Sequence, residues 1–255
     1  MTQSNKIAFI TGGSRGLGKD MALGIAQKGV DVILTYNSQK DKALEVVAAI
    51  EKIGQKAAAL QLNMGDIKSF DGFITNFKNL LSGTFNADKF DFLINNAGAG
   101  FLIPSFAETT EEQFDALFNM HFKGVFFLTQ QLLPFLRDNG SIVNISSGLT
   151  RIGYPGMAAY ASAKGAIEIL TKYLAKELGP RGITANVIAP GAIPTDFGGG
   201  TLRNTPQIQE YMKSITAIPR LGLPEDIGGV VAFLCTPEAR WVTGQRIEVS
   251  GGMYL

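Results

Sequence analysis

The sequence has little of what metal centres, disulfide scaffolds and nucleic-acid-binding surfaces are built from. It contains one cysteine, Cys235, and one histidine, His121. A single cysteine cannot form an intrachain disulfide, which favours a reducing compartment, and these two residues cannot supply the usual ligands of a zinc site. Lys and Arg number 23 against 22 Asp and Glu, and no basic run stands out. We therefore expect no metal and no nucleic-acid partner.

Long hydrophobic runs are missing as well. No stretch approaches transmembrane length, and the apolar segment Ile7–Ile10 is too short for the core of a signal peptide. These absences predict a cytoplasmic protein with no membrane partner. Hydrophobic residues nevertheless make up 45% of the 255 positions, which is typical of a globular chain with a sizeable core.

Short β-rich runs alternate with longer helical patterns along the chain. Several of the runs are almost continuously apolar, which is typical of parallel strands buried on both faces. The expected strands are Ile7–Thr11, Val32–Tyr36, Ala57–Leu62, Phe90–Asn95, Ser141–Ile145, Ile183–Ala189 and Arg246–Val249. The expected helices include Gly16–Lys28, Lys40–Ile53, Glu111–Leu136, Met157–Leu178 and Pro206–Ser214, with Pro134 in the last turn of the third. This order predicts an α/β fold, a Rossmann-type doubly wound parallel sheet forming one domain over residues 1–255.

Two segments interrupt this alternation. Ser82–Lys89 is a polar insertion, expected to be a loop before the fourth strand. Asp196–Thr205 contains Gly198, Gly199 and Gly200, which would make a good hinge. Because this segment follows the sixth strand, it would overhang the carboxyl edge of the sheet, where open α/β sheets bind ligands. We expect a substrate lid over roughly residues 196–215.

A glycine-rich loop follows the first expected strand. The segment Thr11–Gly18 reads TGGSRGLG and leads directly into a helical pattern. Glycines permit a tight turn and a close approach of the backbone to a pyrophosphate, and the helix N-terminus supplies free N–H groups. The loop therefore predicts a dinucleotide phosphate cradle.

The spacing of these glycines is Gly-x-x-x-Gly-x-Gly, and it is accompanied by further motifs. They are Asn95–Gly98, Ser147 with Tyr160 and Lys164, Pro190–Gly191 with Thr195, and Gly251–Gly252. Together they resemble the short-chain dehydrogenase/reductase (SDR) family over essentially the whole chain, in particular its ketoreductases and 3-oxoacyl-[acyl-carrier-protein] reductases. The resemblance implies a sheet of about seven strands and a homotetramer. It also implies that Asn95 to Gly98 line the cofactor and that Ile193 and Thr195 hold the nicotinamide carboxamide.

The cofactor is expected to be NADP(H), although NAD(H) is not excluded. An acid at the end of the second strand would bind the ribose hydroxyls of NAD, but Tyr36, Asn37 and Ser38 stand there instead. Arg15 could pair with a 2′-phosphate in bidentate fashion. The glycine loop and the resemblance together assign the dinucleotide contacts to Gly12, Ser14, Arg15, Gly16, Leu17, Gly18, Tyr36, Asn37, Ser38, Asn63, Met64, Asn95, Ala97, Gly98, Tyr160, Lys164, Pro190, Gly191, Ile193 and Thr195.

Tyr160 and Lys164 are four residues apart in a helical pattern, so they share a helix face. A nearby ammonium favours the phenolate and should lower the pKa of Tyr160 toward neutrality, so that the phenol exchanges a proton with a carbonyl or alcohol oxygen. Ser147, at the end of the fifth strand, could donate to that oxygen. The resemblance implies the same roles, adds ribose binding by Lys164, and selects Ser147 rather than Ser146.

Two positions depart from the family. The family usually has an asparagine where this chain has His121, and that asparagine helps to hold a water in a proton relay behind the lysine. His121 could take its place through the backbone carbonyl, its imidazole could join the relay because its ordinary pKa lies near neutrality, or it could simply cap or bend the helix. Asn63 replaces a more usual acid and should still bind the adenine.

These features predict an NADPH-dependent oxidoreductase that reversibly reduces a ketone or aldehyde to an alcohol. Ala99, Gly100, Phe101, Leu149, Tyr154, Phe197 and the lid to about Ile215 would form a largely apolar pocket with aromatic edges, which suits hydrophobic or aryl ketones. Reduction of a 3-oxoacyl thioester is the main alternative, and it would require a basic patch to dock an acidic carrier protein. A dinucleotide-binding regulator without chemistry is a further alternative, disfavoured because binding alone needs no tuned phenol.

Overall fold

The apolar runs of the sequence become the strands of one parallel sheet in the computed structural model, which describes residues 6–101 and 103–255. Within these residues the sheet has seven strands in the order β3-β2-β1-β4-β5-β6-β7. The strands are β1 (Ile7–Ile10), β2 (Asp31–Tyr36), β3 (Ala57–Gln61), β4 (Phe90–Asn95), β5 (Leu136–Ile145), β6 (Thr184–Pro190) and β7 (Arg246–Val249). The reversal of strand order beside β1 is the switch point at which doubly wound sheets open a crevice.

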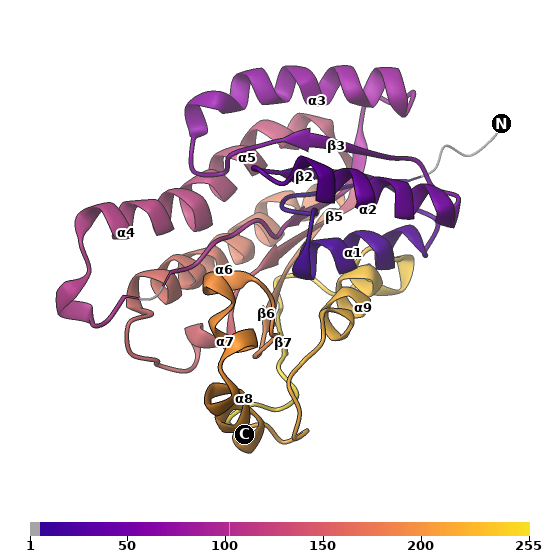
Figure 1. Ribbon diagram of the computed structural model, residues 1–255. Coiled ribbons are helices and arrows are strands. Elements are labelled where there is room, and N and C mark those ends of the chain that lie inside the picture. Colours follow the sequence, from indigo (N-terminus) through magenta and orange to yellow (C-terminus); the bar gives the residue numbers. More distant parts are fainter. Residues whose placement is uncertain (1–5, 102) are drawn as a thin grey trace.

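Helices cover both faces of the sheet (Figure 1). One hydrophobic cluster joins the sheet to α1 (Gly16–Ala26), α2 (Lys40–Ile53) and α9 (Pro224–Leu234). A second joins the opposite face to α3 (Phe70–Thr84), α5 (Gly124–Leu132) and α6 (Ala158–Leu178). The predicted fold class is thereby confirmed, although α3 and α9 were not among the predicted helices.

Local chemistry explains several of the helix ends. Helix α4 (Glu111–Phe118) begins with a capping box, in which Thr110 Oγ1 accepts from the Gln113 N–H and Gln113 Oε1 accepts from the Thr110 N–H. Helix α2 ends at Ile53 and is capped by Gly54, whose φ of 98° lies in the left-handed region that favours glycine. Helix α1 ends at Ala26, two residues before the predicted end.

The prediction of one helix over Glu111–Leu136 is wrong. After α4, residues Asn119–Lys123 form one turn of π-helix, and α5 then continues to Leu132. A 3-10 turn at Leu133–Phe135 contains Pro134 and ends the helical segment. The π turn contains one residue more than an α-helical turn, so it changes the face that α5 presents relative to α4.

Strand β5 begins five residues before the predicted Ser141, at Leu136. Leu136 pairs with Phe90, the register then shifts, and Ser141 pairs with Phe92. Asn139, with a φ of 61°, lies in the intervening bulge, which explains why the polar residues before Ser141 were not predicted as part of the strand. The segment Ser82–Lys89 is likewise only partly a loop, because Ser82, Gly83 and Thr84 complete α3.

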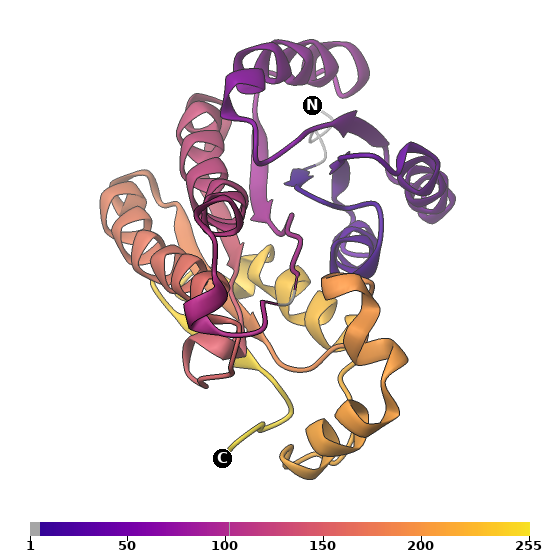
Figure 2. The same ribbon diagram turned by 60° about the vertical axis from the view of Figure 1, so that its left-hand side comes forward.

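The lid segment lies beyond the carboxyl ends of the strands. After Asp196 the chain forms a short turn at Phe197–Gly200, then α7 (Thr201–Asn204) and α8 (Pro206–Ser214), the latter as predicted. Gly198, Gly199 and Gly200 all have positive φ, which glycine adopts without strain. Figures 1 and 2 show α7 and α8 set apart from the layered body. Within residues 6–101 and 103–255, no helix has the length and apolar character needed to cross a bilayer.

Candidate active site

A cleft of about 510 Å³ opens at the carboxyl edge of the sheet. Its walls come from the loops after β1, β2, β4, β5 and β6, and from the lid. All of the predicted catalytic and cofactor-contacting residues line this cleft except Asn95. Among the described residues there is no group of three or more His, Cys, Asp or Glu side chains that could hold a metal ion.

Hydrogen bonds join the glycine loop to the segment that follows β4. Thr11 Oγ1 accepts from the backbone N–H groups of Asn96 and Ala97 at 3.0 Å, and Asn96 Nδ2 donates to the carbonyl oxygens of Thr11 and Gly12. Gly12 has a φ of +67°, and a Cβ there would lie 2.8 Å from the Cα of Ala97. A side chain at position 12 would therefore push apart the two loops that form the floor of the cleft.

Asn95 does not face the cleft, so its predicted cofactor contact is wrong for the side chain. Its Nδ2 donates to Thr129 Oγ1 at 3.1 Å and to Asn144 Oδ1 at 2.8 Å, and the residue is buried. Asn144 in turn donates to Thr171 Oγ1. Asn95 thus joins β4 to β5, α5 and α6 behind the cleft, while Asn96 lines it.

Arg15 lies at the rim, and its partner comes from the lid. Arg15 Nη1 donates to Asp196 Oδ2 at 2.8 Å, and Arg203 of α7 donates to the other oxygen of the same carboxylate. The two guanidinium groups hold the pKa of Asp196 below its usual value. Tyr36, Asn37 and Ser38 form the neighbouring wall, and Lys40 is exposed just beyond it. Asn63 Oδ1 accepts from the Gly65 N–H, which leaves its amide group free within the described residues.

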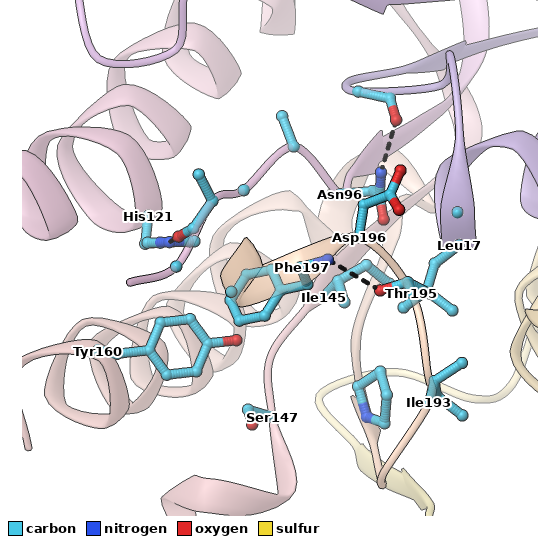
Figure 3. A pocket seen from close by; sticks show the side chains of 18 of the residues that line it. Leu17, Asn96, His121, Ile145, Ser147, Tyr160, Ile193, Thr195, Asp196 and Phe197 are labelled. Carbon is cyan, nitrogen blue, oxygen red and sulfur yellow. Dashed lines mark hydrogen bonds between the residues drawn. The ribbon is translucent and has the colours of Figure 1, made fainter. Parts of the chain in front are cut away.

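Ser147, Tyr160 and Lys164 meet at the centre of the cleft. Figure 3 shows the Tyr160 hydroxyl and the Ser147 side chain facing the same space. Ser147 Oγ accepts from the Leu149 N–H at 3.2 Å, so its own hydrogen remains available for a further acceptor. Lys164 is buried; its Nζ donates to the Ile145 carbonyl at 2.7 Å and lies 5.8 Å from the centre of the Tyr160 ring.

The electrostatics of the tyrosine differ from the prediction. Burial raises the pKa of Tyr160 to about 12, and the hydrogen bond with Ser147 offsets only part of this rise. Burial also lowers the pKa of Lys164 to about 8. The pKa of Tyr160 is therefore raised rather than lowered, because desolvation is the largest influence on it and the lowering contribution comes from the hydrogen bond with Ser147. Near neutral pH, Tyr160 is a protonated phenol and Lys164 a cation.

His121 lies in the π turn, beside the catalytic tyrosine. Its Nε2 lies 2.6 Å from the Ala99 carbonyl, so this nitrogen donates, and its ring stands edge-on to Tyr160 with the centroids 5.1 Å apart. Burial and the Lys164 charge lower the pKa of His121 to about 3. The imidazole is therefore neutral at physiological pH, which disfavours a relay through a side chain that titrates near neutrality. His121 lies within the π turn, where the α-helical hydrogen-bond pattern is interrupted.

The substrate side of the cleft is aromatic. The ring of Phe197 lies 5.5 Å from that of Tyr160, and a Cβ on Gly100 would lie only 2.5 Å from the Phe197 ring (Figure 3). Further out, the hydroxyl groups of Tyr211 and Tyr254 are in hydrogen-bond contact at 2.5 Å. The predicted wall residues Ala99, Gly100, Phe101, Leu149, Tyr154 and Phe197 all line the cleft.

Within the predicted cofactor segment Asn95–Gly98, the sequence analysis did not separate Asn96 from Asn95, and Asp196 was not predicted as the partner of Arg15. Alternation along β4 could have indicated that Asn95 and Asn96 face opposite ways. Asp196 could not have been connected to Arg15 in the same manner, because 181 residues separate the two and only the fold brings them together.

Comparison with known proteins gives consistent matches over the whole chain. A sequence profile of the family described as Enoyl-(Acyl carrier protein) reductase matches residues 12–254. The chain is 36% identical to the 3-oxoacyl-[acyl-carrier-protein] reductase of Staphylococcus aureus, covering 98% of each chain. It is 35% identical to a hydroxynaphthalene reductase-like protein of Metarhizium brunneum, covering 98% of this chain and 95% of that one. Among solved structures, the angucycline C-6 ketoreductase LanV with bound NADP superimposes with a TM-score of 0.92 at 34% identity, covering 98% and 95% of the two chains.

Proposed function

Because this chain belongs to the short-chain dehydrogenase/reductase family and is an NAD(P)H-dependent carbonyl reductase, we propose that it uses NADPH to reduce a ring-bearing ketone, with Tyr160 as the proton donor. The observation that carries this proposal is the meeting of Ser147, Tyr160 and Lys164 in the same cleft as the glycine loop. A regulator that only bound the dinucleotide would not need a hydroxyl pair aimed at one point beside a buried lysine.

The shape of the cleft fits a dinucleotide. The glycine loop is folded closely on itself: a Cβ on Gly18 would lie 2.2 Å from the Gly12 carbonyl oxygen, so only glycine allows the first turn of α1 to approach the loop this closely. Backbone N–H groups at the start of α1 would hold the pyrophosphate, Ala97 and Gly98 would lie along the nucleotide, and Ile193 with Thr195 would hold the carboxamide. The bound cofactor supplies the hydride.

The proton chemistry follows from the charges of the site. A phenol whose pKa is about 12 is protonated at neutral pH, so Tyr160 can donate to the carbonyl oxygen as negative charge develops there. Ser147 donates a second hydrogen bond to the same oxygen. Lys164, charged below about pH 8, favours the phenolate that forms when Tyr160 gives up its proton. The reverse oxidation starts from the phenolate and should therefore be favoured at high pH.

The preference for NADPH rests on Arg15 and on the end of β2. No carboxylate stands at Tyr36, Asn37 or Ser38 to repel a 2′-phosphate, and Arg15 can reach the rim from the glycine loop. The structural neighbour LanV was solved with NADP bound, which supports the same choice.

The substrate is proposed to be a fused-ring or aryl ketone. Phe197 and Tyr160 present ring surfaces to the cleft, and Tyr211 and Tyr254 add hydroxyl groups at its mouth. A flat aromatic substrate would stack against such walls. The likeness to a hydroxynaphthalene reductase-like protein supports this class. A 3-oxoacyl thioester is the second candidate, favoured by the likeness to the Staphylococcus aureus reductase.

We further propose a homotetramer in the cytoplasm. Two adjacent helices expose large apolar side chains, namely Phe126 and Phe127 on α5 and Ile169 and Tyr173 on α6. An apolar face of this kind is suited to burial against a second copy of the chain. Light scattering on the purified protein would measure the mass directly, and a monomer would overturn the tetramer.

The test is ketone-dependent oxidation of NADPH and NADH, side by side, on a panel of aryl ketones, fused-ring ketones, ketoesters and an acyl thioester. Faster turnover with NADPH on the ring ketones is expected. Faster turnover of the thioester would select the second candidate. Equal rates with both cofactors would contradict the role of Arg15, and a lack of turnover on every carbonyl, despite cofactor binding, would contradict the reductase.

A further inference from the structure

Helix α6 carries a third polar residue in line with Tyr160 and Lys164. Glu168 follows Lys164 by four residues, as Lys164 follows Tyr160, so all three share one face of the helix. Tyr160 and Lys164 line the cleft, whereas Glu168 lies outside it with 17% of its side chain exposed. Glu168 therefore does not touch the reacting atoms, and its effect must pass through its neighbours.

One oxygen of Glu168 gathers three donors. Glu168 Oε1 accepts from Ser146 Oγ at 2.7 Å, from Thr150 Oγ1 at 2.7 Å and from Arg246 Nε at 2.8 Å. Three donors on one ionised acceptor form charge-assisted bonds, which are stronger than neutral ones. The carboxylate thus joins α6 to the end of β5 and to β7.

These contacts enclose Ser147 from both sides. Ser146 precedes it, and Thr150 closes the turn that follows. The single hydroxyl hydrogen of Thr150 is shared between Glu168 Oε1, at 2.7 Å, and the Ser147 carbonyl, at 2.9 Å. Arg246 Nη2 donates to that carbonyl as well, at 3.3 Å, and to Thr150 Oγ1 at 3.1 Å. The backbone of Ser147 is therefore fixed relative to the helix that carries Tyr160.

We propose that Glu168, together with Arg246, is a positioning residue for Ser147. The pair sets where the Ser147 hydroxyl lies relative to the Tyr160 hydroxyl, so that both point at one carbonyl oxygen. This inference rests on the proposed role of Ser147 as a donor to that oxygen. Helix α6 would then do more than carry Tyr160 and Lys164. It would also hold Ser147, which follows β5, in position.

The inference can be tested by removing the Glu168 charge, because Arg246 would not be left without an acidic partner. Arg246 Nη1 also donates to Glu248 Oε2 at 3.0 Å, so Arg246 keeps an acidic partner in a Glu168→Gln variant. The amide introduced by this substitution would still offer one carbonyl oxygen to the hydroxyl groups of Ser146 and Thr150. The variant should therefore fold, while its hold on the Ser147 turn weakens.

The experiment compares the wild type with Glu168→Gln and Glu168→Ala in kcat, substrate KM, NADPH dissociation constant and melting temperature. A matched control is Glu177→Gln, which changes an exposed glutamate on the same helix. We expect kcat to fall roughly ten- to hundredfold in Glu168→Ala, because a displacement of about 1 Å in a reacting group costs this much. Glu168→Gln should lose less, Glu177→Gln nothing, and all should bind NADPH within about twofold of wild type.

The decisive measurement is the same substitution in a Ser147→Ala background. If Glu168 acts through Ser147, Glu168→Gln should cause no further loss of kcat once the serine hydroxyl is gone. An equal loss in both backgrounds, or a lower melting temperature with an unchanged kcat, would overturn the inference and leave a purely structural role. If Ser147→Ala alone keeps full activity, the proposed function of Ser147 fails instead, so the two failures are distinguishable.

Discussion

The two sides of the cleft are held together in different ways. On the catalytic side the bonds are buried: Lys164 is 5% exposed where its Nζ donates to Ile145, and Asn95 and Asn144 bridge elements inside the core. On the rim the bonds lie in solvent: the side chain of Arg15 is 52% exposed where it meets Asp196 of the lid. Buried hydrogen bonds are costly to leave unmade, whereas exposed ion pairs contribute little. The difference indicates that the chemistry is fixed in place while the rim can adjust to the ligand.

Substitution of Tyr160 by Phe should have the largest effect. Loss of the proton donor is expected to lower kcat for ketone reduction roughly 10²- to 10⁴-fold, because general acid catalysis contributes this much. The ring keeps its packing against His121 and Phe197, so NADPH binding should stay within about twofold. Single-turnover kinetics and a cofactor fluorescence titration would measure the two quantities. Retained turnover would mean that Tyr160 is not the proton donor, and the buried side of the cleft would then not be the side that carries the chemistry.

Acid should destabilise the catalytic side through His121. Its pKa is about 3 in the folded protein and near 6.5 when unfolded, so between these values the unfolded chain binds more protons and stability falls as pH decreases. At about pH 5 the loss is on the order of 2 kcal/mol from this group. Urea unfolding at about pH 7.5 and pH 5 would measure it. Other groups titrate in the same range, so His121→Gln is the control.

In His121→Gln the difference in unfolding free energy between the two pH values should be smaller by that amount. Gln can still donate to the Ala99 carbonyl, which isolates the titration from the lost hydrogen bond. An equal pH dependence in both proteins would mean that the imidazole is more accessible to protons than its burial implies.

On the rim, Arg15→Gln should raise the KM for NADPH roughly ten- to hundredfold and leave that for NADH within about twofold. The variant loses a charge-assisted hydrogen bond to the 2′-phosphate. A hydrogen bond to a charged group contributes about 1.5–3 kcal/mol. Asn37→Asp, which places a carboxylate at the end of β2, should shift the preference in the same direction. Parallel changes for both cofactors would mean that the rim does not read the phosphate.

The smallest effect is expected from Asp196→Asn. Asp196 pairs with both Arg15 and Arg203, so we expect it to compete with a cofactor phosphate for Arg15 and to stay paired with Arg203 if Arg15 turns to the phosphate. Because exposed ion pairs are weak, NADPH should bind only about two- to fivefold more tightly in the variant, with a smaller gain for NADH. The gain should vanish in an Arg15→Gln background. Weaker binding of both cofactors would show that the ion pair closes over the nucleotide instead.

The sequence predicted the sheet better than the helical segments beside it. Six of the seven strands agree with the prediction within one residue at each end, because their apolar runs are bounded by polar or glycine residues. The π turn at Asn119–Lys123 has no such signal. Its hydrogen-bond pattern is decided by what Leu117 and Val125 pack against on either side, and those partners come from distant elements.

The same contrast holds within the site. The glycine loop and the Tyr160–Lys164 pair are local patterns, and the structure brings both to the cleft. The placement of Glu168 on the same helix face could also have been predicted, because it follows Lys164 by four residues, as Lys164 follows Tyr160. The raised pKa of Tyr160 was not, because it depends on how completely other elements remove water from the hydroxyl.

The π turn also determines where this chain can change in length. Loss of a single codon between Asn119 and Lys123 would restore an uninterrupted α-helix and turn α4 relative to α5 by roughly 100°. Either Leu117 would leave its contact with Ile103 and Ala159, or Val125 would leave the sheet. A deletion in this helical segment should therefore be strongly destabilising.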